Sequence, residues 1–476
     1  MDARVLWSSA EAAAVTAGRA TRDWQATGVA IDSRAVAAGD LFVALKGERV
    51  DGHDFAAAAL AQGAAACVVD HRPAGLPADA PLLEVADTMA ALVALGRAAR
   101  MRCRARIVAV TGSVGKTGTK EALALALATH GATYASTGNL NNQIGVPLAL
   151  ARMPRDAAYA VFELGMNHAG EIAALSALVR PDIAVITNVE PVHLEFFGTL
   201  EAIADAKAEI FASTAKAGTA VLNIDNPMFE RLVEHCGARG LRRILSFGAG
   251  EHAYARLIDC SLHPTVSAVT AEIGGERLDY CLPVPGRHWV INSLAVLAVA
   301  RAAGADLAAA AASLSRLKPI KGRGERHRVV LPGGGAFEVI DDAYNASPPA
   351  MRAALAVLGN MKPGAGGRRI AVLGDMLELG PQADALHHEL APHLLEAGVD
   401  LVFACGKHMR ALFEALPARL RGAHAANAAA LLPRAVGAVR AGDVVLVKGS
   451  LGSRMAPLVA ALRAVADPQV RAANGN

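Results

Sequence analysis

Runs of apolar residues and changes in their spacing divide the 476-residue chain into three stretches. In residues 1–104, the apolar run Asp40–Leu45 predicts a short strand and the alanine-rich run Phe55–Leu60 predicts a helix. Short strands mixed with such helices are typical of a small α/β module. We therefore expect a first domain that ends near residue 104.

Residues 105–318 alternate apolar, strand-like runs with helical segments. Strands are predicted at Ile107–Val110, Tyr159–Glu163, Ile183–Thr187 and Thr219–Asn223. Because strands separated by helices form βαβ units, we expect a mostly parallel sheet with helices on both faces. Polar and apolar residues then alternate over Thr265–Leu282, which predicts an antiparallel extension before a helix that begins near Ile291.

Residues 319–476 repeat the alternation of strands and helices. Strands are predicted at Phe337–Asp341, Arg369–Leu373, Leu401–Ala404 and Val444–Val447. The glycine-rich runs 332–335 and 363–367 are interpreted as turns, because neither opens a helix. A second doubly wound sheet of Rossmann-like shape is expected here. The predicted fold class is therefore α/β, with three domains at residues 1–104, 105–318 and 319–476.

Composition narrows the classes of function. Hydrophobic residues make up 53% of the chain, and the net charge of +3 is too small to indicate binding to nucleic acid or to an anionic membrane. The six cysteines have no C-x-x-C spacing, so neither a zinc site nor a disulfide framework is indicated. No charge-free apolar run reaches the length of a membrane span. A cytoplasmic protein is expected.

The strongest chemical signal is a glycine loop between a predicted strand and a predicted helix. It comprises Thr111, Gly112, Ser113, Val114, Gly115, Lys116 and Thr117. Such a loop turns several backbone N–H groups toward one point, which suits a polyphosphate, while Lys116 reaches the outer phosphates and the Thr117 hydroxyl holds Mg²⁺. The usual pattern has glycine where Val110 stands, so the loop is a variant of the ATP-binding type.

Three polar residues lie at or just beyond the carboxyl ends of predicted parallel strands. They are Thr117, Glu163 and His193. Because ligands gather at this edge of an open α/β sheet, a hydroxyl, a carboxylate and an imidazole together indicate Mg²⁺ ligands. Taken singly, Glu163 is also explained as a capping or ion-pair residue, and His193 as a turn histidine.

One lysine lies in the apolar stripe of the helix predicted over residues 199–214. Lys207 follows Ile203 by four residues, so it is predicted to face inward. A snorkelling stem with its ammonium at the surface is one explanation. The other is an amine whose pKa is lowered by burial and by nearby Mg²⁺. Such an amine reacts with CO₂ to give a carbamate that binds a second Mg²⁺ beside His193.

Motifs along almost the whole chain resemble, in the same order, those of the Mur ligases of peptidoglycan synthesis. They are Thr111–Thr117, Gly138–Asn142, Glu163–His168, Ala206–Phe211, Pro285–His288, Lys321–Arg323, Asp341–Ser347, Gly374–Gly380 and Val447–Ser450. The last two favour the family member that adds a dipeptide.

The resemblance implies a UDP-sugar-binding N-terminal domain, a central ATPase and a C-terminal domain that binds the incoming dipeptide. ATP would phosphorylate UDP-N-acetylmuramoyl-tripeptide to an acyl phosphate, which the amine of D-alanyl-D-alanine attacks. The implied cofactors are ATP and Mg²⁺, and the implied modification is carbamylation of Lys207. Neither nucleic acid nor membrane insertion takes part, and a monomer is expected.

Residue roles are also implied by the resemblance. In the central domain, Gly112 to Thr117 hold the triphosphate, Thr117 and Glu163 hold one Mg²⁺, and His193 with carbamylated Lys207 holds another. Also in the central domain, Asn292 is implied to contact adenine. From the C-terminal domain, Arg323 is implied to contact the γ-phosphate and Asp342 the ribose. The implied substrate residues are Asp32, Ser33, Arg34, Lys46 and Gly47 for the UDP-sugar, and Asn141 and Asn142 for the nascent peptide.

Several of these assignments have alternatives. Trp289 replaces the asparagine usual in the family, and a tryptophan face could take over that adenine contact by stacking. Arg323 lies in a basic stretch that is otherwise an exposed linker, so its role requires the C-terminal domain to swing onto the central one. The residues also explained as structural are Asp375, Glu378 and Lys448.

Proteins of two classes compete with this interpretation. The first class is other ATP-dependent amide ligases, namely a lysine- or diaminopimelate-adding Mur ligase or folylpolyglutamate synthase. From another class, the alternative is a P-loop switch NTPase. The chain has no Asn-Lys-x-Asp segment for reading guanine, and an inward Lys207 has no role in such a switch.

Overall fold

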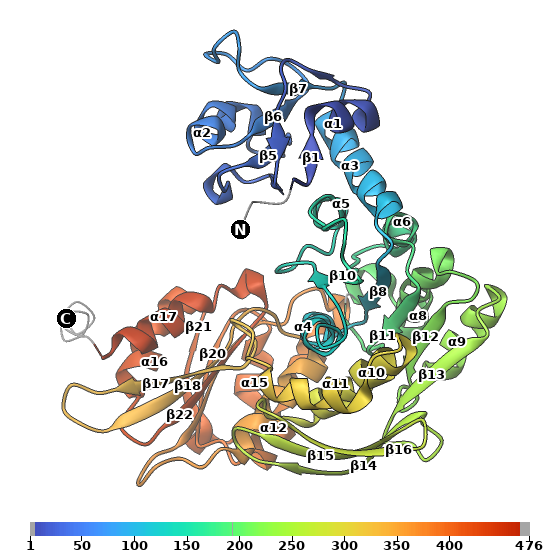
Figure 1. Cartoon of the computed structure of the whole chain (residues 1–476). Helices are drawn as coiled ribbons and strands as arrows, with labels where there is room; N and C mark the ends of the chain where they lie inside the picture. Colours follow the sequence, from blue (N-terminus) through green and yellow to red (C-terminus); the bar gives the residue numbers. More distant parts are fainter. Residues whose placement is uncertain (1–4, 193, 467–476) are drawn as a thin grey trace.

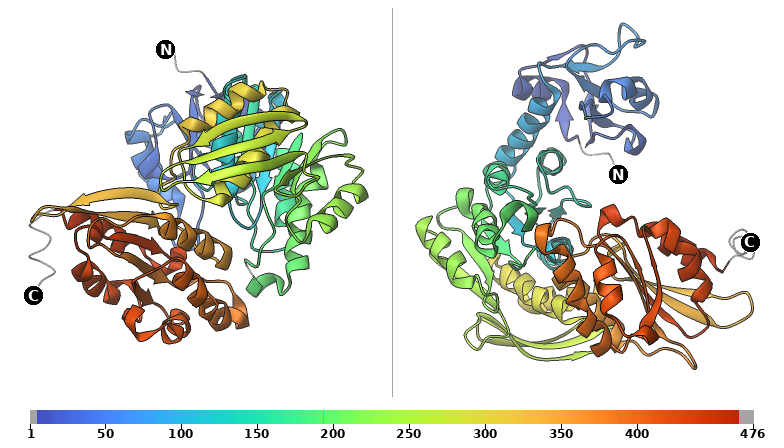
Figure 2. Two further views of the ribbon diagram at one scale, coloured as in Figure 1. Left: turned by 90° about the horizontal axis from the view of Figure 1, so that it is seen from below. Right: turned by 180° about the vertical axis from the view of Figure 1, so that it is seen from behind.

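The computed structural model describes residues 5–192 and 194–466. These residues form three bodies, each built around its own main sheet (Figure 1). Helix α3 (Thr88–Arg102) leads from the first body to the central one, and the third body lies beside the central one (Figure 2). Within the described residues, no helix is long and apolar enough to cross a membrane.

The first body contains a sheet of order β2-β7-β6-β5-β4. Its strands are β2 (Arg19–Ala20), β4 (Gly28–Ala30), β5 (Asp40–Val43), β6 (Ala66–Val69) and β7 (Leu82–Glu84), all parallel to their neighbours except β2. The predicted strand and helix are found as β5 and α2 (Ala56–Ala61). The small sheet of β1 (Trp7–Ser8) and β3 (Gln25–Ala26) links this body to the central one, because the Trp7 indole donates a hydrogen bond to the carbonyl of Ala151 at 2.9 Å.

The central body is a sheet of order β16-β15-β14-β13-β12-β11-β8-β10-β9. Its strands are β8 (Arg106–Thr111), β9 (Thr133–Ala135), β10 (Tyr159–Glu163), β11 (Ile183–Ile186), β12 (Thr219–Asn223), β13 (Arg243–Gly248), β14 (Ala255–Leu262), β15 (Ser267–Ile273) and β16 (Glu276–Leu282). Strands β8 to β14 pair in parallel, whereas β15 pairs antiparallel with both β14 and β16. The predicted parallel sheet and its antiparallel extension are confirmed.

Side chains of the central strands alternate between two cores, one on each face of the sheet. Val108 and Val110 pack under α4 (Lys116–Leu127), α10 (Arg287–Ala302) and α11 (Leu307–Ser313). Ile107 and Ala109 pack under the helices of the opposite face, which are α5 (Gly145–Ala151), α6 (Glu171–Val179), α8 (Leu200–Ala208) and α9 (Phe229–Ala238). Helix α10 begins at Arg287, four residues before its predicted start near Ile291.

The helix predicted over residues 199–214 is shorter than expected. It ends as α8 at Ala208 and continues as the 3-10 turn η3 (Glu209–Ser213). Glu209 at this junction accepts hydrogen bonds from the backbone N–H groups of Gly170 and Ala173, at 2.6 and 3.1 Å. At this tighter turn, the Glu209 carboxylate accepts hydrogen bonds from backbone N–H groups at the start of α6 that have no partner within the helix.

The third body is a sheet of order β17-β18-β22-β19-β20-β21. Its strands are β17 (Glu325–Val330), β18 (Ala336–Asp342), β19 (Arg369–Gly374), β20 (Leu401–Cys405), β21 (Arg421–Ala425) and β22 (Val444–Lys448). All pairs are parallel except β17 with β18. One face is covered by α12 (Pro348–Asn360), α14 (Leu390–Glu396) and α15 (Met409–Ala415), and the other by α16 (Ala428–Ala438) and α17 (Ala456–Ala464).

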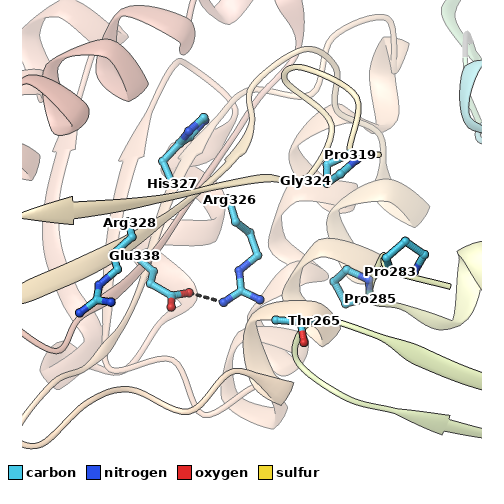
Figure 3. A pocket seen from close by; sticks show the side chains of 9 residues that line it. All are labelled: Thr265, Pro283, Pro285, Pro319, Gly324, Arg326, His327, Arg328 and Glu338. Carbon is cyan, nitrogen blue, oxygen red and sulfur yellow. Dashed lines mark hydrogen bonds and ion pairs between the residues drawn. The ribbon is translucent and has the colours of Figure 1, made fainter. Parts of the chain in front are cut away.

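The alternative of an exposed linker at residues 321–327 does not hold for its second half, which belongs to the edge strand β17 (Glu325–Val330). This strand joins β18 through the predicted turn at 332–335, and its Arg326 side chain reaches the central body. A cleft lies between the two bodies here, and Figure 3 shows Arg326 reaching into it while His327, the next residue, points to the other side of the strand. Arg326 pairs with Glu338 and donates to the carbonyl of Pro264 at 2.9 Å, so it ties the third body to the central one.

Candidate nucleotide and metal site

The glycine loop connects β8 to α4, as predicted, and two of its glycines are sterically required. Gly112 has φ of +144°, and a Cβ added there would lie 1.9 Å from the Thr187 hydroxyl oxygen. Gly115 has φ of +85°, and its Cβ would lie 2.6 Å from the side-chain amide nitrogen of Asn292. The Thr187 hydroxyl also donates to the carbonyl of Val114 at 2.7 Å. The loop is therefore held against the end of β11, with its backbone pressed close to neighbouring side chains.

Lys116 begins α4 and folds back over this loop. Its ammonium donates to the carbonyl of Gly112 at 2.8 Å and reaches that of Ser113 at 3.4 Å. Burial lowers the pKa of Lys116, Glu163 opposes that shift, and the charge of Arg323 adds to it. The third body thus places Arg323 within electrostatic range of the loop lysine.

The predicted pair of metal-binding oxygens meets at the end of β10. Glu163 is 2% exposed, and its Oε2 accepts a hydrogen bond from the Thr117 hydroxyl at 2.9 Å. Its Oε1 accepts one from the amide of Asn141 at 2.8 Å, a contact that the sequence did not predict. A carboxylate and a hydroxyl beside a phosphate-binding loop form the hard oxygen donor set that suits Mg²⁺. His193, the third predicted ligand, lies outside the described residues.

Lys207 on α8 points inward, as its place in the apolar stripe predicted. The residue is 2% exposed, so a snorkelling side chain with its ammonium at the surface is excluded. Desolvation lowers the pKa of Lys207 well below its usual value, and the charge of Lys116 lowers it further. Burial thus favours the neutral form of this amine over its charged form.

Helix α10 crosses the first turn of α4 and presents Asn292 and Trp289 to it. While Asn292 lies against Gly115, the indole of Trp289 lies against Gly118, where an added Cβ would come within 2.7 Å of the ring. The sequence singled out Trp289 but not this contact. Its signal is Gly118 itself, because a glycine inside the first turn of a helix is unfavourable unless something needs the space.

Residues of the third body complete the cluster. The Arg323 guanidinium lies over the ring of Tyr344, 4.4 Å from its centre, and is only partly exposed. Asp342 at the end of β18 accepts a hydrogen bond from Lys448 at 2.7 Å, and burial raises the pKa of this carboxyl although Lys448 counteracts the shift. Lys448 is 3% exposed and also donates to the carbonyl of Asn345, so it pairs with Asp342 rather than only ending β22.

The predicted substrate residues have local partners as well. In the first body, Asp32 accepts from the backbone N–H of Arg34 and pairs with its guanidinium at 2.7 Å, which lowers the pKa of Asp32 to about 2. Ser33 lies in the same short turn, Lys46 forms a backbone bridge with Asp51, and the N–H of Gly47 donates to Val50. These residues are part of the first body and not of the glycine-loop cluster.

Three further candidates have structural partners. The side-chain oxygen of Asn142 accepts from the backbone N–H groups of Gly145 and Ile144, at 2.8 and 3.2 Å, and so caps the start of α5. Asp375 accepts from the N–H of Met409 at 2.8 Å at the start of α15. The carbonyl of Glu378 accepts from the N–H of Glu195 at 3.3 Å, which links the third body to α7 (Leu194–Phe197).

Comparison with known proteins accounts for this arrangement. The middle domain of Mur ligases matches residues 110–300, the Mur ligase glutamate ligase domain matches residues 322–451, and the Mur ligase catalytic domain matches residues 25–101. The chain belongs to the Mur ligase family. Together these matches cover most of the main sheet of each body of this Mur ligase.

Named relatives and solved structures extend over nearly the whole Mur ligase. The UDP-N-acetylmuramoyl-tripeptide–D-alanyl-D-alanine ligase of Escherichia coli is 40% identical over 91% of this chain and 93% of its own, and that of Bacillus subtilis is 34% identical over 91% and 92%. A crystal structure of MurF from Acinetobacter baumannii superposes with a TM-score of 0.82 at 32% identity, covering 96% of this chain and 98% of its own. MurF ligase from Thermotoga maritima, solved in complex with ADP, gives 0.75 at 28% identity, covering 93% and 98%.

Proposed function

We propose that this protein is an ATP-dependent ligase that joins D-alanyl-D-alanine to UDP-N-acetylmuramoyl-tripeptide. The observation that carries the proposal is the meeting of Lys116, Thr117 and Glu163 at one sheet edge, with Arg323 of the third body beside them. Relatives that bear the name of this activity match the chain over nine-tenths of its length, which supports the choice of substrates.

The residues present fit a magnesium nucleotide. Gly112 to Thr117 would hold the triphosphate, Thr117 and Glu163 would supply oxygens to the metal, and Asn292, Arg323 and Asp342 would contact adenine, γ-phosphate and ribose. When bound, Mg²⁺ neutralises charge on the phosphate oxygens. Lys116, released from the loop carbonyls, would pair with the outer phosphates as negative charge develops.

Lys207 fits carbamylation because burial favours its neutral amine, and only the neutral amine attacks CO₂. A nitrogen–carbon bond forms, the nitrogen loses a proton, and the side chain becomes an anionic carbamate. We propose that this carbamate, together with His193, serves a second metal ion. The change places an anion beside the Lys116 ammonium in place of a neutral amine, so that the two side chains attract each other.

The proposed reaction then proceeds in two steps. A carboxylate oxygen of the tripeptide attacks the γ-phosphorus, the bond to the β,γ-bridging oxygen breaks, and ADP leaves. The amine of D-alanyl-D-alanine next attacks the acyl carbon, the carbon–oxygen bond to phosphate breaks, and the nitrogen gives up a proton as the amide forms. Arg323 and Lys116 would stabilise the negative charge of both steps in a site that the third body would close against water.

The three bodies correspond to three proposed tasks. Residues 1–104 would bind the UDP-sugar through Asp32 to Arg34 and through Lys46 and Gly47, residues 105–318 would bind ATP, and residues 319–476 would bind the dipeptide. Asn141, whose amide donates to Glu163, would contact the nascent peptide. Because the side-chain oxygen of Asn142 caps α5, only its amide nitrogen would be available to that peptide.

A coupled assay tests the proposal. Purified protein with Mg²⁺, ATP and UDP-N-acetylmuramoyl-tripeptide is offered D-alanyl-D-alanine, diaminopimelate or glutamate, and ADP, phosphate and the new amide are measured. We expect one ADP and one phosphate per amide, with the dipeptide only. Activity with diaminopimelate or glutamate alone would favour the other ligases, and full-rate hydrolysis without any acceptor would favour a switch NTPase.

A further inference from the structure

Lys120 is a fully buried lysine to which the proposed reaction assigns no role. It lies on α4, is 0% exposed, and its ammonium donates to the carbonyl of Gly138 at 2.8 Å. The carboxylate of Glu121, 3.2 Å away and partly exposed, balances its charge. Removing an ammonium from water is costly, so a lysine at this position needs partners that hold it there.

The carbonyl bound by Lys120 belongs to Gly138, the first residue of the loop formed by residues 138–142. Gly138 has φ of +60°, in the left-handed region that favours glycine. Farther along the loop, Asn141 donates its amide to Glu163 Oε1, and its carbonyl accepts the N–H of Gly165 at 2.8 Å. The loop is therefore tied to α4 at one end and to the strand end that carries Glu163 at the other.

These contacts close a ring around the metal-binding carboxylate. Thr117 and Lys120 are one turn apart on α4 and lie on the same face of that helix. Thr117 binds Oε2 of Glu163 directly, whereas Lys120 reaches Oε1 through the loop and the Asn141 amide. Each oxygen of Glu163 thus has its own partner, and the carboxylate is fixed in one orientation.

We propose that Lys120 is a positioning residue for Glu163: through Gly138 and Asn141 it orients the carboxylate that binds the metal ion of the nucleotide. This inference rests on the proposed function and deepens it. A lysine that only anchored the loop would stabilise the fold without altering metal affinity, so metal binding separates the two roles.

The test is Lys120→Met, which keeps an unbranched apolar stem and removes the ammonium. Lys216→Met is the matched control, because Lys216 is exposed. Electron paramagnetic resonance of Mn²⁺ with ADP present measures the metal Kd, and the coupled assay measures the Mg²⁺ concentration for half-maximal rate. We expect Lys120→Met to weaken metal binding about tenfold, the lower end for loss of a partner behind a metal ligand, and Lys216→Met to leave it unchanged.

A double-mutant cycle with Asn141→Ala checks that both residues act through one link. Each single variant should raise the metal Kd, and the double variant should bind no more weakly than the worse single one. Effects that multiply, or a lowered Tm with an unchanged metal Kd, would overturn the inference. If the wild-type protein binds Mn²⁺ and ADP but forms no amide, the proposed function fails while the positioning role can still be judged from binding.

Discussion

The contact between Trp289 and Gly118 predicts that Gly118→Ala destabilises the wild-type protein but stabilises a variant that lacks the indole. In the wild-type protein, Gly118→Ala places a Cβ 2.7 Å from the indole, closer than real Cβ contacts, so the ring must move. Overpacking of this kind costs about 1–3 kcal/mol, whereas replacing glycine by alanine in a helix gains up to about 1 kcal/mol. The net effect is a loss of about 0–3 kcal/mol.

In a Trp289→Leu background the ring is gone, and only the helical gain remains. Gly118→Ala should then stabilise the protein by up to about 1 kcal/mol, so the coupling between the two positions is about 1–3 kcal/mol. Thermal unfolding with ADP absent and present measures both backgrounds, and 1 kcal/mol corresponds to about 2–4 °C in Tm for a domain of this size. If Gly118→Ala lowers Tm equally in both backgrounds, the indole is not what requires the glycine.

Three further predictions concern buried charges. Glu163→Gln should lower the Mg²⁺-dependent rate at least about 100-fold, because the amide loses the charge that we propose binds the metal, and titration calorimetry with Mg²⁺ and ADP checks the weakened binding. The lowered pKa of Lys207 means that the unfolded chain binds more protons than the folded one, so this lysine destabilises the fold at pH 7. Lys207→Met should therefore raise Tm in CO₂-free buffer at pH 7, by an amount that shrinks toward pH 10. A difference in Tm that does not depend on pH would refute this. Lys448→Met should cost about 3 kcal/mol by leaving Asp342 unpaired, and adding Asp342→Asn should recover part of the lost Tm.

Local patterns in the sequence determined much of this protein. Strands β8, β10, β11 and β12 of the central sheet, the glycine loop and the inward side of Lys207 were all predictable, because each follows from the period of apolar residues or from the φ angles that glycine permits. The convergence of Thr117 and Glu163 was also predictable, since neighbouring parallel strands end at the same sheet edge.

Other features were decided only by the tertiary structure. Strand β17 is mostly polar and became a strand because β18 offered it a free edge. The contacts of Asn141 with Glu163, of Lys448 with Asp342 and of Trp289 with Gly118 join residues that are 22, 106 and 171 positions apart, and no local period records such distances. The physical reason is that a buried polar or bulky group takes its partner from whatever the packed elements bring to it, and that choice is made in space rather than along the chain.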